Sequence, residues 1–463
     1  MGEEEEREQD AAVALPLATD VDAPIPALRS VRAQVAKLGA NGDAELAEGA
    51  DGLDEKAVVV LADPEGLAPE PAMLSPAAFA LASLFNGRRS AREAAQVLSE
   101  QVGQPVPPAN VLELQRKLDE ALFLYSEHFE RTIRRRLRSY LESTVRPAVH
   151  AGSAYPADPE RLQQAVAEYF TAKGGPGVPW PAERQAPEQG AAQAQATAGD
   201  KLRSLILPHI DLRVGGATYA HGYAELLRNS QADLFVILGV AHQSDGSGLY
   251  YVSQKDFATP LGPVKTEHGI ARRLQAAADV EPVLAELAHR TEHSVEFQAI
   301  LLAAVLARCK REFEIVPVLC GSEEAFLAAD NTPSAAQPFK RFTEALRTEL
   351  DETKRKWCVL CSVDLSHVGP EFGNSTMITR RLLPPVERYD RRLLDMVARL
   401  DVAGFYEEIQ RTQNSRHVDA VMAVLTMLHA CHGLLKGGRL LRYDQLLKNE
   451  SHSAVSFAAM AFE

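Results

Sequence analysis

Residues 357–367 read WCVLCSVDLSH, and this stretch decides the fold that the sequence predicts. Its first five residues, 357–361, form a continuous apolar run, which is typical of a strand buried on both faces of a parallel sheet. Polar side chains follow at once, with Asp364 and His367 close behind the apolar run. We therefore predict a buried strand that ends in a group of chemically reactive side chains.

Three further apolar runs have the same character, at residues 205–207, 234–238 and 315–319. Helical periodicity separates the runs, over residues 217–227, 269–277 and 295–307. Strands that alternate with helical segments predict βαβ units. The expected fold class is therefore α/β: a doubly wound, mainly parallel sheet flanked by helices, preceded by a small helical or winged-helix N-terminal domain.

Three of these predicted strands lead into a histidine: His209, His242 and His367. Ligands of an open α/β sheet bind outside the carboxyl ends of its strands. A single histidine is more often a structural residue than a ligand, but three at one edge favour a binding site. Imidazole is a ligand of zinc, iron, copper and nickel.

Residues 288–296, AHRTEHSVE, add a fourth candidate. If this segment is helical, His289 and His293 lie on one face, with Glu292 and Glu296 nearby. The spacing is not HExxH, which disfavours a metalloprotease. We expect His293 to line the pocket and His289 only to cap the helix.

Two cysteines in the strand at 357–361 resemble a CxxC motif, but residues three apart on a strand point to opposite faces. Cys358 and Cys361 are therefore expected to be buried core residues. The five cysteines are scattered, which does not indicate a disulfide framework.

The chain of 463 residues has a net charge of −14, and residues 1–56 carry 14 acidic against 5 basic side chains. We predict a mostly disordered acidic arm there, with a short helix over 27–38, and no nucleic-acid binding at that end. The sequence has no apolar signal segment and no run long enough to span a membrane. We expect a cytoplasmic protein with no membrane partner.

Residues 57–125 show helix-start signals at Ser75-Pro76, at Ser90 with Glu93, and at Pro107-Pro108, after a possible strand at 57–61. This part resembles the small winged-helix domains of the PqqD type, which bind peptides in radical-SAM peptide maturation. A generic helical docking domain is the alternative. Residues 126–142 are expected to form a basic connecting helix, and 173–200 a flexible insertion within a main domain over 143–463.

The main domain resembles the Memo family over about 310 residues. The phrases that carry the resemblance are, in chain order, RPAVHAGSAYP at 146–156, LPHID at 207–211, LGVAH at 238–242, TPLGPV at 259–264, EHSVE at 292–296 and SVDLSH at 362–367. Bacterial members are called protein B of the AmmeMemoRadiSam system. The family is similar in fold to class III extradiol dioxygenases.

This resemblance implies an iron or copper site that His209 and His242 bind together with a cysteine. It further implies that Asp364 and His367 line the site, with His367 as the acid–base group. The phrase matching the family's CGRHP is NSRHV, which puts Asn414 at the position of the thiolate and lowers the expected preference for copper(I). Asp211, which replaces a glycine, is either a substitute carboxylate ligand or, preferably, a residue that contacts the ligands without binding the metal or caps a helix.

Three functions remain open from the sequence. The first is a non-haem iron or copper oxidoreductase acting on a small molecule or peptide, with His293 orienting the substrate and a radical-SAM protein as a possible partner. The second is a non-catalytic accessory, peptide-binding protein with a degenerate metal site. The third, less favoured, is a zinc hydrolase.

Overall fold

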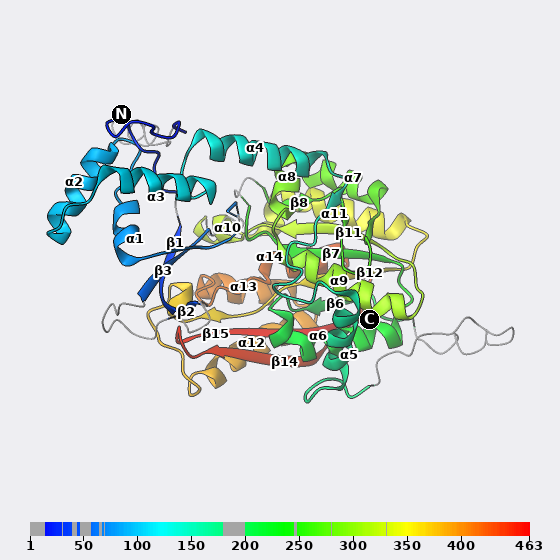
Figure 1. Cartoon of the computed structure of the whole chain (residues 1–463). Helices are drawn as coiled ribbons and strands as arrows, with labels where there is room; N and C mark the ends of the chain where they lie inside the picture. The colour runs from blue at the N-terminus through cyan, green and yellow to red at the C-terminus, as the bar shows by residue number, and fades with distance from the viewer. Residues whose placement is uncertain are drawn as a thin grey trace. The chain divides into compact units, whose positions relative to one another are not determined.

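The computed structural model describes residues 14–29, 31–38, 44–46, 57–63, 67–68, 70–178, 200–244, 248–278, 280–329 and 331–463. The chain divides into two compact units, 1–140 and 141–463, each described by itself below (Figure 1). Most of the expected insertion at 173–200 lies outside the described residues. Within the described ranges, no helix is both long and apolar enough to cross a membrane.

The first unit combines a sheet with helices. The sheet has the order β2-β1-β3-β4, formed by Ala44–Leu46, Arg32–Leu38, Ala57–Ala62 and Ala72–Leu74. Three helices pack with it: α1 (Pro76–Ala82), α2 (Ala91–Val102) and α3 (Pro108–Glu120). The predicted caps are present, because Ser75 accepts from Ala78 N and Ser90 forms a capping box with Glu93.

The predicted helix over 27–38 is wrong, because β1 occupies most of it and pairs antiparallel with β3. Cross-strand pairing overrides the weak local helical preference there. Residues 14–29 are also ordered and not part of a disordered arm: Ile25 is fully buried, and Arg29 forms a buried ion pair with Asp63. The rest of the predicted acidic arm lies largely outside the described residues. Helix α4 (Glu127–Glu142) follows, at the place of the expected basic helix.

The second unit contains the predicted parallel sheet, with the order β10-β11-β7-β12-β6-β15-β13. Its parallel strands are β10 (Lys265–Thr266), β11 (Glu314–Cys320), β7 (Leu234–Val240), β12 (Trp357–Ser362) and β6 (Ser204–Leu207). The four predicted strands are thus confirmed. Antiparallel strands extend the sheet: β15 (Ser453–Phe462), β13 (His367–Val368), β14 (Gly438–Lys448) and β8 (Tyr250–Val252).

Helices cover both faces of this sheet, so the unit is doubly wound. One core contains residues of α5 (Pro159–Thr171), α6 (Leu212–Asn229), α8 (Pro282–His289) and α9 (His293–Arg308). The other contains residues of α7 (His268–Ala278), α11 (Gln337–Glu352), α12 (Leu383–Ala398), α13 (Val402–Thr412) and α14 (Val421–Ala430).

The buried strands contribute alternate side chains to the two cores. Within β12, Cys358 packs into one core and Cys361 into the other. The prediction that these cysteines point to opposite faces is therefore confirmed. Burial raises the pKa of both thiols, which keeps them protonated.

Candidate metal centre

The carboxyl ends of two parallel strands and the start of one helix bring three of the predicted histidines together. His209 lies just after β6, His242 just after β7, and His293 is the first residue of α9. The ring centroids of His209 and His242 are 5.0 Å apart, those of His209 and His293 5.0 Å, and those of His242 and His293 5.1 Å. Three imidazoles therefore form one compact group at the edge of the sheet.

Asp419 completes a set of three side chains that could hold a metal ion. His209, His242 and Asp419 each offer one ligand atom, and these atoms all lie within 4.8 Å of one another. The Oδ2 atom of Asp419 is 3.0 Å from Nε2 of His209. Asp419 was not predicted from the sequence, because it lies in the loop between α13 and α14 and follows no strand. In the sequence, Asp419 is marked only as an acidic residue shortly before the apolar run that forms α14.

The contact between His209 and Asp419 fits a bound cation. Nδ1 of His209 is 3.0 Å from the carbonyl oxygen of Ser362 and must donate its proton there. In the neutral imidazole, Nε2 is then an acceptor that faces a carboxylate oxygen. That oxygen is buried and makes no hydrogen bond to any described residue. Two acceptors at 3.0 Å repel each other unless a proton or a metal ion lies between them.

The negative charge around His209 also favours a bound cation. Burial disfavours the imidazolium, but the carboxylates of Asp419 and Asp364 outweigh burial and raise the pKa of His209 to about 10. Without a metal ion, Nε2 of His209 is therefore protonated, and its positive charge neutralises part of the negative charge of these carboxylates. A divalent cation would supply the same positive charge and leave the imidazole neutral, as metal binding requires.

Glu292 orients the other two histidines. It is the N-cap of α9, and its carboxylate accepts from the backbone N–H groups of His242, His293 and Ser294. Nδ1 of His242 and Nδ1 of His293 each lie 3.1 Å from this carboxylate. Although burial opposes it, these histidine contacts hold the pKa of Glu292 well below its usual range. Such carboxylate–histidine pairs fix the tautomer of a ligand, here leaving Nε2 of His242 as the acceptor.

The expectation that His289 and His293 share one helix is wrong. His289 ends α8 and His293 begins α9, because Glu292 takes the extended conformation of an N-cap between them. His289 is fully buried, with Nε2 3.0 Å from the carbonyl oxygen of Tyr251. Burial lowers the pKa of His289 to about 4, so it is a neutral core residue.

Asp364 lies beside His209, and His367 is close enough to interact electrostatically with Asp364 and Asp419. Asp364 Oδ1 accepts from the backbone N–H of His209 at 3.1 Å, and its Oδ2 is 3.9 Å from Nε2 of that residue. Burial, together with the charge of Asp419, raises the pKa of Asp364. Nδ1 of His367 is 3.0 Å from the carbonyl oxygen of Leu365 and donates to it, which leaves Nε2 as its proton acceptor.

Two residues proposed as metal ligands lie outside this group. Asp211 is the N-cap of α6, accepts from the backbone N–H of Arg213 at 2.8 Å and pairs with the Arg213 guanidinium. Asp211 therefore has the capping role that was expected in preference to a ligand role. The amide of Asn414 is also occupied, because it bonds to Val418 and Glu323. The structure thus offers Asp419 as the third ligand in place of either residue.

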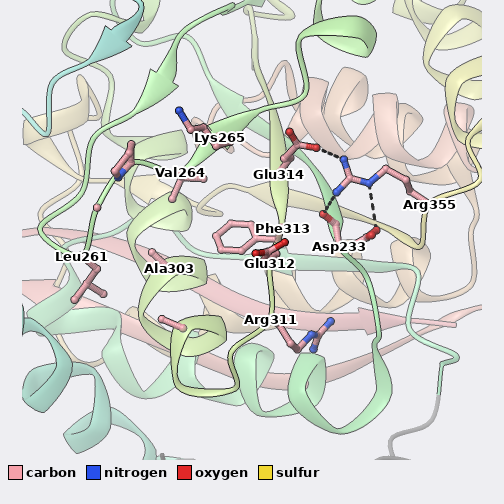
Figure 2. A pocket seen from close by; sticks show the side chains of 13 residues that line it. Asp233, Leu261, Val264, Lys265, Ala303, Arg311, Glu312, Phe313, Glu314 and Arg355 are labelled. Carbon is pink, nitrogen blue, oxygen red and sulfur yellow. Dashed lines mark hydrogen bonds and ion pairs between the residues drawn. The ribbon is translucent and has the colours of Figure 1, made fainter. Parts of the chain in front are cut away.

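The second unit also has a surface cavity away from the histidine group. This cavity of about 600 Å³ lies at the opposite, amino ends of β7, β11 and β12 (Figure 2). Figure 2 shows Arg355 there in ion pairs with Asp233 and Glu314. Charged groups that neutralise one another do not suggest a catalytic site, so the histidine edge remains the candidate site.

Comparison with known proteins agrees with the resemblance seen in the sequence. Residues 146–461 match the family described as "Memo-like protein". A "MEMO1 family protein" of Aquifex aeolicus is 27% identical over 404 residues, which cover 87% of this chain and 95% of that protein. Another, "MEMO1 family protein PF1638" of Pyrococcus furiosus, is 28% identical over 267 residues, 57% of this chain and 80% of that protein. Because the family match spans more than half of its length, this chain belongs to the Memo-like protein family.

Proposed function

We propose that this protein is a mononuclear non-haem iron oxidoreductase in which His209, His242 and Asp419 bind Fe(II). The supporting observation is the convergence of one ligand atom each from His209, His242 and Asp419 within 4.8 Å, with Nε2 of His209 3.0 Å from the buried Oδ2 of Asp419. Two histidines and one carboxylate are the ligand set of non-haem Fe(II) oxygenases. No cysteine belongs to this group, which disfavours copper(I).

Bound iron would supply redox and Lewis-acid chemistry to a small-molecule or peptide substrate. The protein's own groups would then bind and orient the substrate and move its protons. His367 is suited to accept a proton at Nε2, because its Nδ1 is fixed by a carbonyl oxygen. His293 is suited to orient the substrate: it stacks on His242 at an interplanar angle of 22°, and burial lowers its pKa, so it is neutral. A radical-SAM protein remains the partner that we propose from the family resemblance.

Metal content tests this proposal directly. The purified full chain is loaded with Fe(II) without oxygen, desalted and measured by elemental analysis, beside His209→Ala, His242→Ala and Asp419→Asn. We expect about one iron per chain in the wild type, as a single three-ligand set implies, and a large loss in each variant. His432→Ala and Asp395→Asn change exposed residues of the same types outside the site and should retain iron. A wild type that holds no more iron than His209→Ala would overturn the proposal.

Zinc is the second candidate, because two histidines and one carboxylate also form a catalytic zinc set. The same loading with equal Fe(II) and Zn(II), followed by an oxygen-uptake assay and an ester-hydrolysis assay, separates the two. Hydrolysis that depends on Zn(II) and on Asp419, without oxygen uptake by the iron form, would favour the zinc hydrolase.

A further inference from the structure

Asn414 and Glu323 connect the loop that carries Asp419 to the end of β11, a strand that contributes none of the three candidate ligands. Glu323 follows the carboxyl end of β11 and is buried. Its carboxylate accepts from Nδ2 of Asn414. The same amide donates to the carbonyl oxygen of Val418 at 3.1 Å, and Asn414 Oδ1 accepts from the backbone N–H of Val418 at 2.9 Å. Every polar atom of the Asn414 side chain is therefore engaged, and Val418 directly precedes Asp419.

The loop that Asn414 closes, residues 413–419, carries several groups of the site. Asp419 Oδ2 lies 3.0 Å from His209 Nε2, and its Oδ1 accepts from the backbone N–H of Asp364 at 2.8 Å. The carbonyl oxygen of Arg416 accepts from the backbone N–H of His367 at 2.7 Å. The carbonyl oxygen of His417 lies 3.1 Å from Nδ1 of that histidine. Moving this loop would therefore displace a candidate ligand and the neighbouring acid–base group together.

The loop also has an unusual backbone. Gln413, Asn414 and His417 have φ angles of 49°, 41° and 48°, in the left-handed region that residues other than glycine adopt at a cost. Asparagine tolerates this region better than most residues, and a side chain bonded to its own loop helps to hold it. Such a conformation persists only where surrounding contacts fix it. Here the bonds of Asn414 to Val418 and to Glu323 are among those contacts, and they are the ones that act on the backbone next to Asp419.

We propose that Asn414 and Glu323 act together as positioning residues that place Asp419 against His209 as the third metal ligand. In this chain the residue at the position of the family's cysteine thus fixes the loop, and the ligand is supplied five residues later. This inference rests on the proposed iron site. It differs from a ligand role for position 414, because a cysteine there would remove the amide bonds that hold the loop.

Fe(II) affinity tests the pair in the full-length protein. The variants are Asn414→Cys, Asn414→Ala, Glu323→Ala, the double alanine variant, and Glu323→Gln, which keeps an acceptor for the Asn414 amide. Loss of a group that orients a ligand typically weakens metal binding about 10- to 100-fold. We expect losses of that size in Asn414→Cys, Asn414→Ala and Glu323→Ala, no larger loss in the double variant, and affinity within about threefold of wild type in Glu323→Gln.

Thermal unfolding of the metal-free variants serves as the folding check. Should Asn414→Ala prove unfolded, the comparison of Glu323→Ala with Glu323→Gln decides. Tighter Fe(II) binding by Asn414→Cys, or wild-type affinity in both alanine variants while His209→Ala has lost iron, would overturn the positioning role and leave the iron site standing. Equal, negligible binding by wild type and His209→Ala would overturn the iron site itself.

Discussion

Replacement of Arg146 by methionine should destabilise the second unit more than any exposed arginine replacement. The Arg146 side chain is fully buried and forms an ion pair with Glu296, whose carboxylate also accepts from Tyr155 OH and from His150 N. Its Nε donates to the carbonyl oxygen of His289 at 2.7 Å, and Nη2 to that of Glu292 at 2.7 Å. Arg146 therefore holds both ends of the turn that presents Glu292 to His242 and His293.

The expected loss follows from these contacts. Removing one partner of a buried ion pair costs about 3–5 kcal/mol, because the remaining charge stays buried and uncompensated. Two carbonyl oxygens also lose charged donors, so we expect the free energy of unfolding to fall by roughly 5 kcal/mol. Urea denaturation followed by tryptophan fluorescence reports on this unit, because Trp357 lies in β12 of its central sheet.

Two further variants sharpen the Arg146 experiment. Arg399→Met removes an exposed ion pair with Asp395 and should cost less than about 1 kcal/mol. Arg146→Met combined with Glu296→Gln should recover part of the loss, because the buried charge is gone while an acceptor for Tyr155 remains. A loss in Arg146→Met no larger than in Arg399→Met would refute the reasoning.

Three other changes test separate parts of the account. Gly239→Ala would place a Cβ 2.5 Å from Ser294 Oγ, so the start of α9 must shift. We expect the free energy of unfolding to fall by about 1–3 kcal/mol in a denaturation experiment. Fe(II) binding, measured by iron titration, should also weaken. Because burial lowers the pKa of His289 to about 4 from 6.5, the unfolded chain binds more protons between these values, so up to about 3 kcal/mol of stability present above pH 6.5 is lost as the pH falls towards 4. The variant His289→Gln should lack that part of the pH dependence in denaturation series at pH 7 and pH 5. Cys361→Ala should lower stability by about 1 kcal/mol and leave the iron content unchanged, whereas loss of iron would indicate a thiolate ligand.

Much of the sheet could be predicted from local sequence, because a strand buried on both faces needs an uninterrupted apolar run. The runs that became β7, β11 and β12 are of this kind. Parallel strands end at one edge, so the meeting of His209 with His242 followed from the fold class. Strand β1 was mistaken for a helix, because its pairing partner, β3, lies well beyond it in the sequence.

The third candidate ligand could not be predicted in the same way. Asp419 follows a helix instead of a strand, and only the packing of the loop at 413–419 brings it to His209. The family resemblance directed attention to Asn414, whose amide is bonded to Val418 and Glu323. Glu292 was noticed as a neighbour of His293, but its role depends on the break between α8 and α9, which the apparent helical spacing concealed.

The most direct test of the central claim is a crystal structure of the Fe(II)-loaded protein, with anomalous diffraction measured on both sides of the iron absorption edge. We predict one iron peak in contact with Nε2 of His209, the imidazole of His242 and the carboxylate of Asp419. Glu292 should bond to the histidines and not to the metal. An iron peak between His242, Glu292 and His293, a second possible group among the described residues, or the absence of iron at His209, would contradict the account.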